Sequence, residues 1–387
     1  MNTHTIENNT PVIPADAYDT TAFYADPDAI ATVTNTTAPD AVALPSEDAS
    51  TAELLATAQE AGHRAVPAPL AETALVARPL LRRAGLPVPD GPLSYAIAPE
   101  LTIHYAHPAA SPIGSAGCLG DDDTLLVTGT LRRVPWARAA DAVVVLAAAP
   151  FGPVLFTLTP SQAHVTPGTN LAEEPRDDLH LAALEIPASQ VRRIGPELVD
   201  EARLRAALAR SALIAGAAER CVDLTVAHTT ARTQFGRPLS RFQAVKQEEA
   251  RLIEETALVR TAVQTAATPL DIGGPAAHFA VAAAKTQASA SAAEIARIAH
   301  QLHGAIGITQ LHPLHLATTR LWSWRDEDGD ETYWAHRLAR PLTPTTLWPA
   351  LTTTQIAPAA QAIEVSRGNG SPERIWADYA DATRSAS

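Results

Sequence analysis

Residues 325–331 read RDEDGDE, and this run offers three carboxylates that could do chemistry, those of Glu327, Asp328 and Glu331. A carboxylate in a dry pocket, with a raised pKa, can take a proton from a weakly acidic carbon. A charged run of this length is also typical of a solvated turn. Proton abstraction therefore requires that the fold bury part of the run.

Two further segments combine a helix end, a glycine-containing turn and polar side chains. The first, RTQFGRPLSRFQAVK, covers residues 232–246, and the second, QLHGAIGITQLHPLHL, covers residues 301–316. Turns of this kind let backbone N–H groups approach an anion. Either segment alone is equally well explained as a structural helix break.

The elements that must position these residues change in type along the chain. Residues 1–48 lack periodicity and are interpreted as a flexible tail, and residues 49–91 carry two helical patterns that form a short N-terminal helical domain. Short β-rich runs predict a middle antiparallel β domain over residues 92–194, with a hairpin at residues 121–130. Long helical patterns from Pro196 onward predict a C-terminal helical bundle over residues 195–387. The fold class is therefore α+β.

Composition limits the class of protein. The 387 residues carry a net charge of -13, which argues against nucleic acid and against an anionic membrane surface as partners. No apolar run is long enough to span a bilayer, and the N-terminus lacks the pattern of a signal peptide. We therefore expect a cytoplasmic protein. Cys118 and Cys221 lie far apart without zinc-ligand spacing, so we expect neither a disulfide framework nor a cysteine metal site.

Taken together, the two glycine-containing segments and the helix–β–helix order resemble the acyl-CoA dehydrogenase family. The resemblance covers about residues 50–340 and is strongest over 196–320. It implies the cofactor FAD. It implies that Arg232 contacts the pyrophosphate, and that Gln234 and Phe235 lie beside the adenosine half. Phe242 and Gln243 would follow on the next helix.

The same resemblance implies that Gln301, Gly304 and Gly307 reach FAD across a subunit interface, so the protein would be at least a dimer. Trp136, in the segment ValProTrpAlaArg, would form a wall of the flavin site, the alternative being ordinary packing in the β domain. Histidines 303, 312 and 315 cluster near the second segment. A His–Pro pair at a helix start is common in this family without a metal, so we expect no metal site.

Several positions depart from the family pattern. The usual Gly-Gly pair is Gly304-Ala305 here, and a methyl group could crowd the cofactor or oppose a positive φ. The thioester loop, Thr-Glu-x-x-x-Gly-Ser-Asp in the family, reads SYAIAPE at residues 94–100. Counting from Gly304 to the family's catalytic Glu-Gly pair reaches Asp328-Gly329, with Glu327 and Glu331 as alternative bases. The family's other base position, on the first long helix, is Ala206.

The resemblance implies flavin-dependent α,β-desaturation of an acyl thioester, carried on CoA or on a carrier protein. Two alternatives remain open: a catalytically degenerate partner subunit of a hetero-oligomer, and a family member repurposed in a biosynthetic pathway. The assembly would be a homodimer, a homotetramer or a hetero-oligomer with a related subunit. An electron-transferring flavoprotein or oxygen would accept the electrons. Arg260, Lys285 and Arg320 are candidates for attracting the acidic carrier arm.

Overall fold

A computed structural model describes residues 42, 46, 48–106 and 124–340. Most of the predicted tail, Cys118, the first residues of the predicted hairpin and the chain after residue 340 lie outside the described residues. The limits assigned to the individual domains stay predictions. Within the described residues, the order of helices, then strands, then helices is confirmed.

The N-terminal helices form where the sequence predicts them. Helix α3 (Thr51–Arg64) begins at a capping box, in which the Ser50 hydroxyl accepts from the Glu53 backbone N–H and the Glu53 carboxylate accepts from the Ser50 backbone N–H. After residues 65–71, a π-helical stretch, η2 (Glu72–Ala77), continues directly into α4 (Arg78–Ala84). Gly85 ends this helix with φ of 64°.

The middle segment folds into two four-stranded sheets. The first has the order β1-β4-β5-β8, formed by β1 (Leu93–Ala98), β4 (Ala142–Ala149), β5 (Gly152–Leu158) and β8 (Val191–Arg193). The second has the order β2-β3-β7-β6, formed by β2 (Thr102–Tyr105), β3 (Thr124–Pro135), β7 (Arg176–Pro187) and β6 (His164–Thr166). Short helices η3 (Ala137–Ala139), η4 (Pro160–Gln162) and η5 (Ala188–Gln190) connect the strands. A core of apolar side chains from both sheets, among them Leu125, Val143 and Phe156, lies between them.

Two details of the β segment differ from the sequence-based prediction. The β1–β4 pair is parallel, whereas the other strand pairs of both sheets are antiparallel. The hairpin predicted at residues 121–130 is wrong in its described part. Residues from Thr124 run on as one strand to Pro135, and Gly129 lies at an irregularity in the β3–β7 register with φ of 140°. The glycine permits a bulge within the strand rather than a reversal of the chain.

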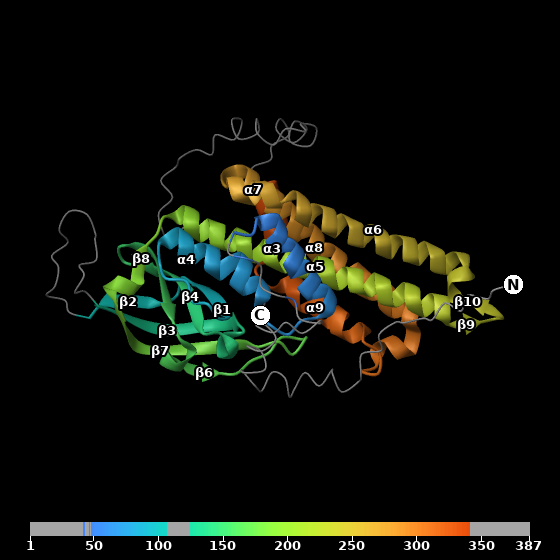
Figure 1. The fold of residues 1–387 in the computed structure, drawn as a ribbon, viewed down its shortest axis with the longest axis horizontal. Coiled ribbons are helices and arrows are strands. Elements are labelled where there is room, and N and C mark those ends of the chain that lie inside the picture. Colours follow the sequence, from blue (N-terminus) through green and yellow to red (C-terminus); the bar gives the residue numbers. More distant parts are fainter. Residues whose placement is uncertain (1–41, 43–45, 47, 107–123, 341–387) are drawn as a thin grey trace.

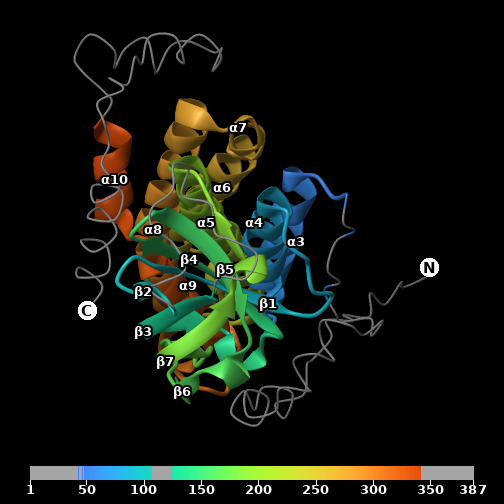
Figure 2. The same ribbon diagram turned by 90° about the vertical axis from the view of Figure 1, so that its left-hand side faces the viewer.

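The C-terminal segment is a bundle arranged around one central helix, α5 (Pro196–Ala231), which begins with proline in its first turn as predicted. The other helices of the bundle are α6 (Gln243–Thr265), α7 (Ala267–Ile272), α8 (Gly274–His303), α9 (Leu314–Asp326) and α10 (Glu331–Ala339), with short helices η6 (Leu239–Arg241) and η7 (Gly304–Ile308). Helices α3, α6, α8 and α9 all contact α5. Looking along the molecule, α3 and α4 lie on one side of α5 and α10 on the other (Figure 2).

Close approach of α3 to α5 depends on two glycines. A methyl group on Gly216 would lie 1.8 Å from the Gln59 carbonyl oxygen, and one on Gly62 would lie 2.2 Å from the Leu213 carbonyl oxygen. The helices therefore touch through their backbones. This contact fixes α3 against the middle of α5 (Figure 1).

Helix α5 spans the length of the bundle, because 36 residues rise about 1.5 Å each, or about 54 Å in all. Its first half lies beside the sheets, and its end lies at the opposite extreme of the molecule, beside the small hairpin of β9 (Thr233–Gln234) and β10 (Arg237–Pro238) (Figure 1). In the part of the chain that the structure describes, none of the helices combines the length and apolar character needed to cross a bilayer.

Candidate functional site

A cavity of about 680 Å³ lies where the β sheets meet the first half of α5 and the end of α9. Its wall includes side chains from β1, β3, α5 and the segment that follows α9. The lining residues used below are Tyr95, Arg176, Ala206, Arg210, Glu327, Asp328, Gly329 and Trp334. The charged run at 325–331 is therefore partly buried at a cavity wall and is not a fully solvated turn.

Asp328 leaves the end of α9 in a left-handed conformation, with φ of 56°. Aspartate tolerates this region better than most residues. Its backbone carbonyl accepts a hydrogen bond of 2.9 Å from the indole N–H of Trp334, which is 1% exposed. The neighbouring Gly329 has φ of 93°, and a methyl group there would lie 2.5 Å from the same indole. The turn thus holds the Asp328 backbone in one position at the cavity.

The Asp328 carboxylate is bound on the protein side by two residues. The Tyr95 hydroxyl lies 2.8 Å from both carboxylate oxygens, and Nε of Arg210 donates to Oδ2 at 3.0 Å. Burial and the negative charge of Asp328 raise the pKa of Tyr95 well above its usual value, so its hydroxyl stays protonated as a donor. The hydroxyl has a single proton to share between the two oxygens, so two donors, Tyr95 and Arg210, bind a carboxylate that has about four acceptor positions.

Glu327, the neighbouring carboxylate, is fixed more tightly. Arg176 donates to both of its oxygens at 2.8 and 2.7 Å, Asn170 donates at 3.0 Å, and Arg210 lies 3.1 Å away. Burial alone would raise the pKa of Glu327, but the two guanidinium groups outweigh it and lower the pKa to about 2. Glu327 is therefore a permanent anion at neutral pH and a poor general base.

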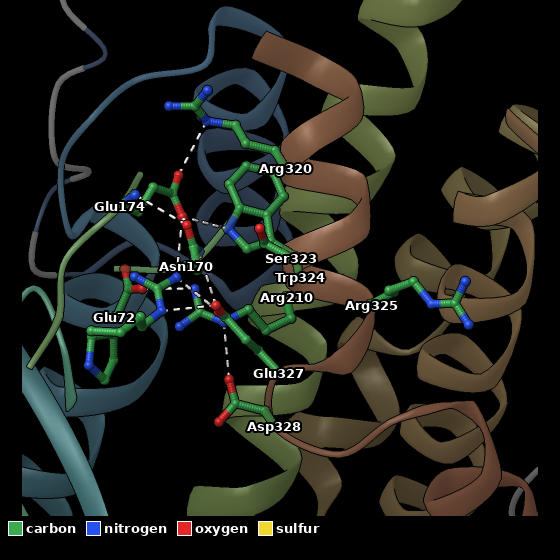
Figure 3. A network of polar contacts seen from close by, with 12 residues as sticks. Glu72, Asn170, Glu174, Arg210, Arg320, Ser323, Trp324, Arg325, Glu327 and Asp328 are labelled. Carbon is green, nitrogen blue, oxygen red and sulfur yellow. Dashed lines mark hydrogen bonds and ion pairs between the residues drawn. The ribbon is translucent and has the colours of Figure 1, made fainter. Parts of the chain in front are cut away.

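These contacts belong to a larger network of buried charges (Figure 3). Arg210 also donates to Glu72 on η2 at 2.7 Å. Farther along, Glu174 lies 3.1 Å from Arg176, lies 3.1 Å from Arg320 and accepts from the Trp324 indole at 2.9 Å. Arg325 points away from the network (Figure 3). Since each buried charge has an oppositely charged neighbour, removing one partner would leave another unpaired in the interior.

Lys285 on α8 binds the end of α9. Its Nζ donates to the carbonyl oxygens of Trp324 and Arg325 at 2.9 Å each and to the Ser289 hydroxyl at 3.1 Å. The ammonium group therefore caps the last turn of α9, immediately before Glu327. Burial lowers the pKa of Lys285 to about 7.

Burial also corrects one sequence-based hypothesis. Lys285 and Arg320 are 0% and 1% exposed, so neither can attract a substrate arm from solution. Arg260 is about half exposed and pairs loosely with Glu219 at 3.7 Å.

Of the other residues that the sequence predicts near the reacting atoms, one lines the cavity and two do not. Ala206, at the family's alternative base position, lines the same cavity as Asp328. Glu331 is exposed at the first turn of α10, and the cavity wall does not include it. Trp136 is 2% exposed within the main core, where packing accounts for it, and it does not line the cavity.

The first glycine-containing segment forms a two-residue hairpin at the far end of α5. Phe235 and Gly236 occupy its turn with φ of 50° and 78°, an arrangement that suits glycine but strains phenylalanine. The Phe235 ring is 89% exposed and meets the Phe242 ring edge-on at 6.2 Å. The Arg237 guanidinium lies 4.1 Å from the centre of the Phe242 ring. Arg232 and Gln234 are exposed beside them.

The second segment ends α8 at the same extreme of the bundle. Gln301 and Gly304 are exposed, and Gly304 has φ of 64° with open space where a side chain would be. Ala305 does not share this positive φ, so its methyl group brings no backbone strain. Gly307 is buried, and a methyl group there would lie 2.6 Å from Cβ of His303. Stacking of His228 on His303, with ring centres 4.7 Å apart, joins the two segments.

The structure thus separates the predicted site residues into two groups. Ala206 at the cavity and Arg232 at the hairpin lie 26 positions apart on one continuous helix, or about 39 Å. This is much farther than one dinucleotide can bridge. Residues Arg232, Gln234, Phe235, Phe242, Gln301 and Gly304 gather at one end, whereas Asp328 and Glu327 gather at the other.

Tyr95, Arg176 and Arg210 were not predicted from the sequence, and Lys285 was predicted for a different role. The signal for Lys285 was available, because it is the one charge in an alanine-rich stretch, AVAAAKTQASASAA, whereas Arg210 shares its stretch, RAALARSALIAGAA, with Arg205. A single charge within an apolar helix is typically buried and paired. Tyr95 carried no such signal, because nothing local distinguishes it from a core aromatic.

Comparison with known sequences identifies the helical part. Residues 198–333 match the family profile described as acyl-CoA dehydrogenase, C-terminal domain. Over 112 residues the chain is 40% identical to acyl-CoA dehydrogenase IpdE2 of Mycolicibacterium smegmatis, covering 29% of this chain and 34% of that protein. It is 27% identical to acyl-CoA dehydrogenase FadE27 of Mycobacterium tuberculosis over 271 residues, 66% of this chain and 70% of that protein.

Comparison with solved structures extends the likeness to the whole fold. The chain matches a crystal structure of the ChsE4–ChsE5 complex from Mycobacterium tuberculosis with a TM-score of 0.68 and 23% identity, over 84% of this chain and 89% of that one. At this identity the likeness concerns the fold. The chain spans about a third of the length of the IpdE2 relatives that it matches.

Proposed function

We propose that this chain, which belongs to the acyl-CoA dehydrogenase family, takes part in FAD-dependent α,β-dehydrogenation of an acyl thioester. The observation that carries the proposal is the position of Asp328. It stands where the family resemblance expects the base, and it lines a cavity large enough for part of a substrate.

Residues of the hairpin end fit a role in holding FAD. Arg232 is free of the core at the end of α5, where its guanidinium can pair with phosphate. Phe235 keeps a large apolar ring in water on a strained turn, which is costly unless a ligand or partner covers it. Gly304 leaves open space beside exposed backbone. When bound, FAD supplies the acceptor for the substrate's β-hydride.

The separation of the two groups supports an assembly of at least two chains. An FAD whose flavin lies at the Asp328 cavity is out of reach of Arg232 in the same chain, about 39 Å away along α5. A second chain would bring its own hairpin end to this cavity. That chain is either a second copy or a related subunit.

In the proposed reaction Asp328 accepts the α-proton of the thioester. Its carboxylate keeps acceptor positions that Tyr95 and Arg210 do not fill, and these two residues fix its orientation. Desaturation transfers the proton to this carboxylate and the hydride to flavin, so both electrons leave with the hydride. The thioester carrier, CoA or a carrier protein, and the final electron acceptor, an electron-transferring flavoprotein or oxygen, belong to the proposal.

A second candidate function is favoured by the same contacts. Asp328 is held by two donors, Tyr95 and Arg210, as an ion-paired structural carboxylate would be, and Ala206 offers no substitute. The chain would then complete the FAD site of a related catalytic subunit. The fold match to a complex of two named components is compatible with such pairing.

Anaerobic reduction of flavin by an acyl thioester separates the two candidates. We expect the purified assembly to bind FAD and to bleach when a panel of acyl-CoA esters is added. Asp328→Asn should slow bleaching by about 100-fold or more while retaining FAD. Glu331→Gln, which removes an exposed carboxylate from the same run, should leave the rate unchanged.

The outcomes are distinct. Bleaching at the wild-type rate in Asp328→Asn would remove Asp328 as the base. If the chain binds FAD only with a related subunit, and bleaching is then insensitive to Asp328→Asn, the partner-subunit function replaces the catalytic one. A colourless protein in both preparations would contradict both.

A further inference from the structure

Three histidines from distant parts of the chain meet at the hairpin end of the bundle. His228 comes from the last turn of α5, His303 ends α8, and His312 lies between η7 and α9. One ring nitrogen of each lies within 4.8 Å of the others. The ring centres of His303 and His312 are 4.6 Å apart. The cluster differs from the one that the sequence suggests, because His228 takes the place of His315.

His303 has one nitrogen that lacks a partner. Its Nδ1 lies 2.7 Å from the Ala299 carbonyl oxygen, which can only accept, so the proton of the neutral ring is on Nδ1. The lone pair is then on Nε2, which is buried without a hydrogen-bond partner in a residue that is 5% exposed. A buried polar atom without a partner is uncommon and calls for a ligand.

The three rings are held neutral at physiological pH. Burial lowers the pKa of all three, that of His303 to about 4. The positive charges of Arg232 near His228 and of Arg220 near His312 act in the same direction. Metal binding requires deprotonated ligands, so this environment leaves the imidazole lone pairs available.

We propose that His228, His303 and His312 bind one Zn²⁺ ion, with water as the fourth ligand. Zinc commonly takes three histidines and a water in tetrahedral geometry, with Zn–N distances of about 2.0–2.1 Å. Tetrahedral ligands at that distance lie about 3.3 Å apart. The nitrogens, now within 4.8 Å of one another, need to approach by no more than about 1.5 Å, which side-chain rotation on three separate elements can supply.

His312 has to give up one hydrogen bond to bind the ion. The Leu314 backbone N–H now donates to its Nδ1 at 3.2 Å, near the long end of the normal range. Binding zinc through Nε2 moves the ring proton to Nδ1 and releases this bond. His315 stays outside the site, because its Nδ1 lies 2.8 Å from the His312 carbonyl oxygen.

The bound ion would join three segments: the end of α5 before Arg232, the end of α8 before Gly304, and the loop that leads into α9. It would therefore fix both glycine-containing segments in one arrangement. This inference does not depend on the proposed dehydrogenation, because the ligands belong to the chain itself and their test needs neither FAD nor substrate.

The test is metal binding to the untagged, chelator-treated full chain. We expect one equivalent of Co²⁺ to bind with the intense visible absorption of a tetrahedral complex, and one equivalent of Zn²⁺ to displace it. His228→Phe, His303→Phe and His312→Phe should each weaken binding by at least about 10-fold. His315→Phe, which removes the nearby histidine in the first turn of α9, should bind as the wild type does.

A second measurement covers variants that fail to fold. Zn²⁺ should raise the melting temperature of the wild-type chain, because it binds the folded state. The inference is overturned if the wild type binds no stoichiometric metal and its melting temperature does not change with Zn²⁺. It is also overturned if folded variants of the three histidines keep wild-type affinity.

Discussion

Tyr95 on β1 donates its hydroxyl to the carboxylate of Asp328, which lies 233 residues later in the chain, with 2.8 Å to each oxygen. This single contact links the first strand of the β sheets to the end of α9. It places a buried phenol and a cavity-lining carboxylate in one hydrogen-bonded unit, to which Arg210 adds a charge.

Tyr95→Phe removes one donor from Asp328 and preserves the ring. A hydrogen bond to a charged group contributes about 1.5–3 kcal/mol, so we expect the free energy of unfolding to fall by about that amount in urea titrations. Tyr333→Phe is the control: its hydroxyl accepts a hydrogen bond from Arg337. Equal losses in both variants would contradict a special role for Tyr95.

Arg232→Ala should release flavin. The residue is exposed, so the free energy of unfolding should change by less than about 0.5 kcal/mol. Loss of one charge-assisted contact to phosphate should weaken FAD binding by about 10-fold or more, measured by flavin fluorescence after dialysis. Arg260→Ala, another exposed arginine of the bundle, should keep wild-type occupancy. Full occupancy in Arg232→Ala would exclude the assigned phosphate contact.

Glu327→Gln should destabilise the chain at neutral pH by roughly 3–5 kcal/mol, because Arg176 and Arg210 lose a buried counter-charge. The pKa of Glu327 is lowered to about 2, so its stabilisation is complete above the ordinary value of about 4.5 and is lost as pH falls toward 2. The difference in the free energy of unfolding between wild type and Glu327→Gln should therefore become smaller in acid. Asp326→Asn, at an exposed pair, should cost little at any pH. If this difference in stability is the same at pH 6 and pH 3, the lowered pKa of Glu327 is refuted.

Lys285→Met tests the capping of α9 through its pH dependence. The pKa of Lys285 in the folded chain is lowered to about 7 from about 10.5, so the unfolded chain binds the additional proton between these values. Wild-type stability relative to the variant should therefore rise with pH above 7, by up to about 1.4 kcal/mol per pH unit. Urea unfolding of both proteins at pH 6.5 and 9 gives the difference. A constant difference would mean that Lys285 keeps its ordinary pKa.

The sequence alone predicted much of the fold. Helix α5 (Pro196–Ala231) begins where the helical pattern from Pro196 onward predicts a helix, because its apolar pattern is long and both ends are marked, by Pro196 and by the Gly236 turn. Strands β4 and β5 coincide with two of the short β-rich runs between turn residues that predict the β domain. Strands β1 and β7 were missed: β1 is almost wholly buried and does not alternate, and β7 carries charged residues that a local reading assigns to a loop.

What the sequence by itself determined is the resemblance to the acyl-CoA dehydrogenase family, the order of helices and strands, and Asp328 as a candidate base, because these rest on local pattern and spacing. Only the tertiary structure decided that Glu327 forms ion pairs with Arg176 and Arg210, that Tyr95 donates to Asp328, and that His228 lies beside His303 and His312. The physical reason is that charge pairing, burial and ligand geometry depend on residues tens to hundreds of positions apart, which meet only when helices and sheets pack. The distance between the cavity and the hairpin also follows only from the structure. It depends on α5 being one unbroken helix, which rises about 1.5 Å per residue.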